Sequence, residues 1–69
     1  MKVSARNVLK GTIKEIRTGM INTEVVLVVE GGSEIVSIIT KDASEALALK
    51  VGGMAYAVIK ASNVMIAVE

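Results

Sequence analysis

The sequence predicts a mostly-β fold with five strands and one short helix between the third and fourth strands. Apolar and polar residues alternate along several segments, as they do in strands whose side chains point alternately to two faces. Glycine pairs and polar turns separate these segments, and only one segment carries a helix start signal. The chain of 69 residues is therefore expected to form a single domain over residues 1–69.

The first strand is expected from Val8 to Arg17. Its side chains alternate regularly as far as Ile13, and Ile16 then breaks the alternation. An extra residue in a strand changes the face that the following side chains occupy, so we expect a β-bulge near Glu15. The turn Thr18-Gly19 ends this strand.

The second strand is expected from Met20 to Glu30, and it is apolar on both faces between Val25 and Val29. A surface antiparallel strand normally has one polar face. We therefore expect its own core to cover one face and a partner subunit to cover the other. The pair Gly31-Gly32 is a hairpin signal, after which Ser33 to Thr40 forms the third strand.

The helix is expected to begin at Asp42, because Asp42 and Glu45 have the spacing of a capping box, and to run to about Leu47. The fourth strand follows from Met54 to Lys60. A tight turn at 61–63 then leads to a fifth strand from Val64 to Val68. Five strands with a small helix between the third and fourth match the order of an OB-like barrel.

Composition favours an oligomer. The chain is small and has no cysteine, so no disulfide supports the fold, yet 52% of its residues are hydrophobic. That is more apolar surface than one small core can hide, and exposed apolar patches usually mark interfaces.

The chain lacks the residues that several classes of function require. The chain has no histidine, and its carboxylates are scattered, so we expect neither an enzyme nor a site for direct metal-cation ligands. Its net charge is +1 and Tyr56 is the only aromatic residue, so we expect no nucleic-acid binding.

We do not expect membrane insertion either. The segment from Val51 to Val68 has a single charge, Lys60, but Gly52-Gly53 and Ser62-Asn63 interrupt it. No signal peptide is expected at the start, because Ser4 to Asn7 is polar where an apolar stretch should begin. The expected location is the cytoplasm.

Two short segments are rich in hydrogen-bond donors and contain no carboxylate: Ser4-Ala5-Arg6-Asn7 and Lys60-Ala61-Ser62. A pocket made from them would present hydroxyls, a guanidinium, an ammonium and backbone N–H groups. That set suits a small deprotonated oxyanion, which can only accept hydrogen bonds. Plainer roles stay open, with Lys60 blocking sheet pairing at an edge and Arg6 as a solvated terminal charge.

These segments also carry a family resemblance. The stretch from Ser4 to Gly11, the strand residues from Thr23 to Leu27 and the stretch from Val58 to Ile66 resemble the molbindins, the small molybdate-binding proteins also called molybdenum-pterin-binding or Mop proteins. The resemblance covers residues 1 to about 67, nearly the whole chain.

The resemblance implies an OB-like fold assembled as a hexamer, a trimer of dimers, that stores molybdate or tungstate between subunits and has no enzymatic activity. In the family, the first donor segment of one subunit and the second donor segment of another line one class of anion site. This implies that the ligands are Ser4, Ala5, Arg6, Asn7, Lys60, Ala61 and Ser62. The family also has a second class of anion site near the threefold axis, which corresponds here to Gly19, Met20 and Asn22. The family name mentions a pterin, but the chain has no dedicated aromatic pocket for a pterin ring, because Tyr56 is its only aromatic residue.

Two alternatives from other classes remain. The same type of domain forms the regulatory end of transporter ATPases and of molybdate-responsive transcription regulators. Because we expect this chain to consist of the domain alone, such a role would be played in trans. The second alternative is a structural oligomer whose anion sites are incidental.

Overall fold

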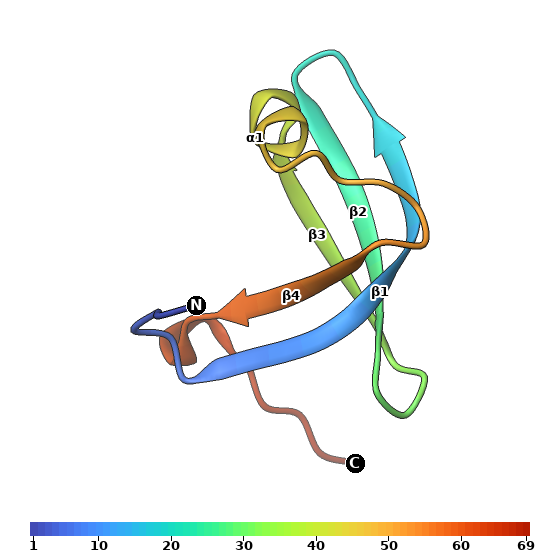
Figure 1. Cartoon of the computed structure of the whole chain (residues 1–69). Coiled ribbons are helices and arrows are strands. Elements are labelled where there is room, and N and C mark those ends of the chain that lie inside the picture. Colours follow the sequence, from blue (N-terminus) through green and yellow to red (C-terminus); the bar gives the residue numbers. More distant parts are fainter.

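The computed structural model describes all 69 residues and contains four strands and one short helix. The strands form one antiparallel sheet in the order β3-β2-β1-β4, which curls into an open half-barrel (Figure 1). The elements are β1 (Asn7–Thr18), β2 (Asn22–Val29), β3 (Glu34–Thr40), α1 (Lys41–Ala46), β4 (Met54–Ile59) and the 3-10 turn η1 (Ala61–Asn63). The predicted mostly-β fold and the place of the helix are confirmed.

The expected bulge lies in β1. Ile13 pairs with Leu27 and Glu15 pairs with Val26, so Lys14 is the extra residue between them. As a result, Ile13 and Ile16 both reach the core although two residues separate them. The loop before β4 is fastened at the same place, because the Gly52 N–H donates to the Ile13 carbonyl over 2.8 Å.

The predicted fifth strand is wrong for the single chain. Residues 64–68 form no strand, and the chain beyond η1 runs away from the sheet (Figure 1). Met65 and Ile66 are 93% and 86% exposed. The alternating pattern favours an extended backbone, but a strand also needs a hydrogen-bonding neighbour, and this segment has none within its own chain. The barrel is therefore open.

The predicted helix cap is also wrong, by two residues. Thr40, the last residue of β3, caps α1, and its hydroxyl accepts a 3.0 Å hydrogen bond from the Ala43 N–H. Asp42 instead lies in the first turn. Both residue types are good caps, and the sequence does not show that the helix follows β3 without a loop.

The helix is attached to the end of the sheet through buried polar side chains. The Ser44 hydroxyl donates to the Lys41 carbonyl over 2.7 Å and lies 3.4 Å from the hydroxyl of Thr23, which is fully buried. No buried side-chain polar atom lacks a partner. This contact closes one end of the half-barrel, at the opposite end of β1 from the two chain termini (Figure 1).

The core is small and the apolar surface is large. Ile13, Val25 and Leu27 form the buried cluster on the inner face. Beside it lies an open apolar groove of about 410 Å³, in which 13 of the 14 lining residues are hydrophobic. Val36 and Ile38 of β3 are about 60% exposed, at 59% and 62%. The sequence expectation of excess apolar surface is thus met in a single chain. The one α-helix, at six residues, is too short to cross a bilayer.

Candidate oxyanion-binding site

The two donor segments lie together at one end of the sheet. They line an open pocket of about 590 Å³. Its lining consists of Ser4, Ala5, Arg6, Val58, Lys60, Ala61, Ser62 and Asn63. Six of the seven residues expected in the first anion site are therefore neighbours, and both segments come from the same chain.

Strand pairing explains why segments so far apart in sequence meet. β1 and β4 are antiparallel, and their ladder ends at the pair Asn7 and Ile59. The residues just before β1 and just after β4 therefore emerge side by side, and Figure 1 shows the N-terminal segment beside η1. The η1 turn is closed by a 2.9 Å hydrogen bond from the Asn63 N–H to the Lys60 carbonyl. This turn folds residues 61–63 into the pocket wall.

Asn7 is the exception among the expected ligands. It is half-buried in β1 and is not part of the pocket wall. Its side-chain Nδ2 donates a hydrogen bond of 3.2 Å to the Ile59 carbonyl. The structure thus places Asn7 behind the pocket, in contact with the backbone that leads to Lys60.

Asn63 lines the pocket although it was not among the expected ligands. Its position directly after Ser62, inside a tight turn of donors, is the signal that could have found it. Val58 is also part of the wall, beside Ala5 and Ala61. It could not have been found, because its place follows only from the β1–β4 register.

The charges of the pocket are not neutralised by neighbouring side chains. The wall contains no carboxylate, and neither Arg6 nor Lys60 forms an ion pair. An open pocket with two uncompensated cations and backbone N–H groups attracts an anion.

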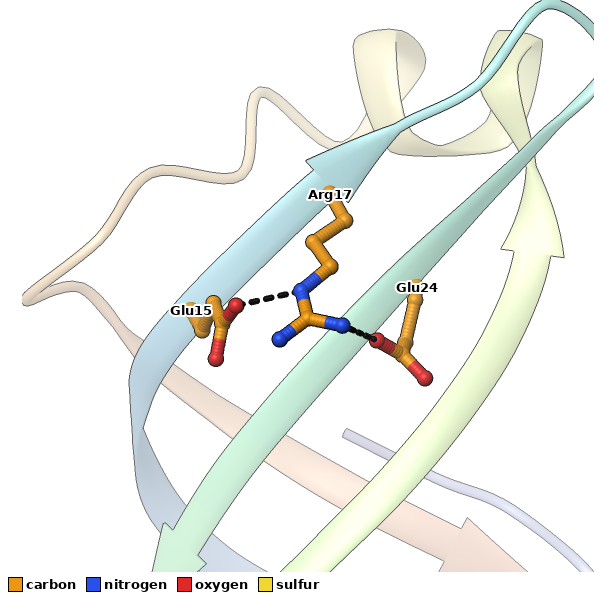
Figure 2. Close-up of polar contacts among 3 residues, drawn as sticks. All are labelled: Glu15, Arg17 and Glu24. Carbon is orange, nitrogen blue, oxygen red and sulfur yellow. Dashed lines mark hydrogen bonds and ion pairs between the residues drawn. The ribbon is translucent and has the colours of Figure 1, made fainter.

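Two other cations of the chain behave differently. Arg17 lies between Glu15 and Glu24 on the β1–β2 surface (Figure 2). Its hydrogen bond to Glu15 and the nearby negative charges raise the pKa of Arg17 above its ordinary value. Lys14 donates to Glu34 over 2.6 Å, and this hydrogen bond raises the pKa of Lys14. These exposed pairs leave no charge available for an anion.

The residues expected in a second anion site lie at the turn between β1 and β2. The Gly19 N–H donates to the Asn22 carbonyl over 2.8 Å, and Met20 is 95% exposed. No pocket lies at this turn of the single chain. The structure also contains no group of three or more His, Cys, Asp or Glu side chains that could hold a metal cation.

The family is shown by comparison with known proteins. The model of the TOBE domain matches residues 3–66. The chain belongs to the TOBE domain family. It is also 48% identical over 66 residues to molybdenum-pterin-binding protein 1 of Clostridium pasteurianum, covering 96% of this chain and 97% of that protein. The resemblance to the Mop proteins is therefore confirmed.

Solved structures agree with this assignment. MopII from Clostridium pasteurianum superposes with a TM-score of 0.93 at 43% identity, covering 97% of this chain and 100% of that chain. A structure of the cytoplasmic molybdate-binding protein ModG with molybdate bound gives a TM-score of 0.90 at 55% identity. That match covers 94% of this chain and 46% of the ModG chain.

Proposed function

We propose that this TOBE domain binds molybdate or tungstate in the pocket between its two donor segments and serves intracellular molybdenum storage and homeostasis. One observation carries the proposal: a single pocket joins the segments 4–6 and 60–63 and contains two cations without a carboxylate. The names of its relatives support the choice of ligand, since they are molybdenum-pterin-binding and molybdate-binding proteins. A cytoplasmic location and the absence of catalysis belong to the same proposal.

The donor set explains the preference for this class of anion. Molybdate and tungstate are deprotonated tetrahedral dianions near neutral pH, so their oxygens only accept hydrogen bonds. The Lys60 ammonium and the Arg6 guanidinium only donate, and hydroxyls and backbone N–H groups can donate as well. Charge-assisted hydrogen bonds of this kind are the stronger ones.

The same donor set disfavours phosphate. Near neutral pH, phosphate keeps a proton and must donate one hydrogen bond. The pocket offers that proton few acceptors beyond the hydroxyls of Ser4 and Ser62 and the Asn63 side chain. A polar group left without a partner costs roughly 1–3 kcal/mol, which corresponds to about fivefold to a hundredfold in affinity.

We also propose a homo-oligomer, a hexamer built as a trimer of dimers. Its support is the apolar surface that one chain leaves uncovered: the groove of about 410 Å³, the exposed β3 residues Val36 and Ile38, and the exposed segment 64–68. In such an assembly, the donor segments of a second subunit and the residues Gly19, Met20 and Asn22 would contribute to anion sites between subunits.

Calorimetric titration with sodium molybdate tests the binding proposal, with sulfate and phosphate as competitors. Lys60→Ala should weaken molybdate binding about tenfold to a hundredfold, because a hydrogen bond to a charged group contributes roughly 1.5–3 kcal/mol. Lys10→Ala is the matched control, since Lys10 is an exposed lysine of β1 that pairs with Tyr56, outside the pocket wall.

Three outcomes would contradict the proposal. No binding to the parent protein would leave the structural oligomer as the remaining interpretation. Equal affinities for molybdate and phosphate would show that the donor set does not select the ligand. Equal losses of molybdate affinity in Lys60→Ala and Lys10→Ala would show that the anion is attracted by the overall positive charge of the surface and not by the pocket.

A further inference from the structure

The β1–β4 ladder ends where the pocket begins. Its last pair is Asn7 and Ile59, and the next residues outward in both strands, Arg6 and Lys60, are pocket residues. No strand pairing continues beyond this point. The end of a ladder is where backbone hydrogen bonds open most readily. The geometry of the pocket therefore depends on how firmly this last pair is held.

The Asn7 side chain reinforces that pair. Its Nδ2 donates to the Ile59 carbonyl over 3.2 Å, joining residues 52 positions apart in the chain. The Ile59 carbonyl belongs to the peptide group whose nitrogen is that of Lys60. Because the peptide group is planar, fixing its oxygen also fixes the direction in which the backbone enters Lys60. One side chain thus ties the Arg6 side of the pocket to the Lys60 side.

We propose that Asn7 is a positioning residue of the oxyanion pocket. Its amide clamps the Ile59 carbonyl and holds the second donor segment against the first, and it does not contact the anion itself. This inference rests on the proposed function, and it changes the role of Asn7 from the direct ligand implied by the family resemblance. Its support is that Asn7 is half-buried, absent from the pocket wall and already bonded to backbone through its nitrogen.

Molybdate affinity gives the first test. Asn7→Leu keeps a similar volume but removes the donor, and we expect it to lower affinity about threefold to tenfold, the effect of one ordinary hydrogen bond. Asn7→Gln keeps the amide on a longer stem and should restore part of the loss. Thr12→Ala is the matched control, because Thr12 pairs with Met54 at the other end of the same ladder and should leave affinity unchanged.

Hydrogen exchange in the anion-free protein separates a clamp from a ligand. The N–H groups of Asn63 and Val64 are hydrogen-bonded within the η1 turn, to the carbonyls of Lys60 and Ala61. A clamp acts before any anion arrives, so both amides should exchange faster in Asn7→Leu than in the parent or in Thr12→Ala. A direct ligand would leave their exchange unchanged, and that result would overturn the positioning role.

The two proposals fail in different ways. A parent protein that binds no molybdate would overturn both the proposed function and the positioning role. Unchanged affinity in Asn7→Leu beside a clear loss in Lys60→Ala would overturn the positioning role alone. A loss of affinity in Asn7→Leu that Asn7→Gln partly restores, together with faster exchange of the Asn63 and Val64 amides, is the supporting result.

Discussion

At the residue scale, Gly11 shows how closely β1 and β2 approach. A Cβ atom built on Gly11 would collide with the Val28 carbonyl oxygen and lie 2.9 Å from Leu27 Cγ. The first of these is backbone, which cannot turn away as a flexible side chain can. The absence of a side chain at position 11 is therefore a packing requirement of the sheet.

We predict that Gly11→Ala destabilises the fold by about 1–3 kcal/mol, the usual cost of inserting a methyl group into a packed region. Urea denaturation should show a lower midpoint with an unchanged slope. Thr12→Ala, at the neighbouring exposed position, is the control. Equal midpoints for Gly11→Ala and the parent would mean that β1 and β2 can move apart without cost.

Single residues also mark the limit of the sequence analysis. Segments 4–6 and 60–62 were expected to share a site, and they line one pocket of the chain. Asn7 was grouped with them because it continues the donor-rich stretch, but β1 begins at Asn7. Within a strand, the pairing with the neighbouring strand decides where each side chain lies. The pairing cannot be read from a short contiguous motif such as residues 4–7.

At the element scale, the end of helix α1 carries local strain. Ala48, just beyond the last helical turn, has φ of 51°, in the left-handed region that favours glycine. The turn is closed by hydrogen bonds from the Ala48 N–H to the Glu45 carbonyl and from the Leu49 N–H to the Ser44 carbonyl. These bonds require the left-handed conformation whichever residue occupies position 48.

We predict that Ala48→Gly stabilises the protein by up to about 1 kcal/mol. The left-handed conformation costs an L-residue roughly 1–2 kcal/mol, and the extra flexibility of glycine in the unfolded chain offsets part of the gain. Differential scanning calorimetry should show a raised Tm. A lowered Tm would mean that the extra flexibility of glycine in the unfolded chain outweighs the relief of strain at position 48. Ala46→Gly, inside the helix, should be destabilising and serves as the contrasting variant.

Elements with a strong local pattern were predictable, and the fifth strand shows why others were not. The bulge in β1 and the Gly31-Gly32 turn follow from residues next to each other in sequence. Residues 64–68 have the pattern of a strand, but strand formation requires a partner that the local sequence does not specify. The start of α1 was misplaced for a similar reason, because the length of β3 decides that Thr40 becomes the cap.

At the scale of the whole molecule, the uncovered apolar surface predicts assembly. We predict that native mass spectrometry at micromolar concentration shows mainly a hexamer, about 43 kDa for six chains of 7.2 kDa. Ile38→Lys should shift the population to smaller species, because Ile38 is 62% exposed on the outer face of β3 and a buried unpaired lysine is costly. A mainly monomeric parent would contradict the assembly, and an intact Ile38→Lys hexamer would contradict a contact through this face.

The charges of the side chains should change little near neutral pH. The chain has no histidine and no cysteine, whose side chains ordinarily titrate closest to this range. The pKa values of Lys14 and Arg17 are both raised in the folded protein. The stability that their ion pairs contribute is therefore fully present at any pH below the ordinary pKa of each cation, and it is lost only as pH rises through the raised pKa.

We therefore predict that molybdate affinity and Tm are nearly constant from about pH 6 to pH 8.5. Calorimetric titration and thermal scans across this interval, in buffers matched for ionic strength, measure both quantities. A step in affinity inside the interval would reveal a titrating group at the pocket that the donor set does not explain.

The meeting of segments 4–6 and 60–63 at one pocket also has a consequence for biosynthesis. A ribosome makes residues 60–63 only after the residues of all four strands and the helix, so the anion site is the last part of the fold that can form. A nascent chain that has emerged only as far as β3 carries the first donor segment and lacks both β4 and the second donor segment. If the pocket binds molybdate as proposed, the anion cannot guide the early steps of folding on the ribosome, because only chains translated past Asn63 contain both donor segments.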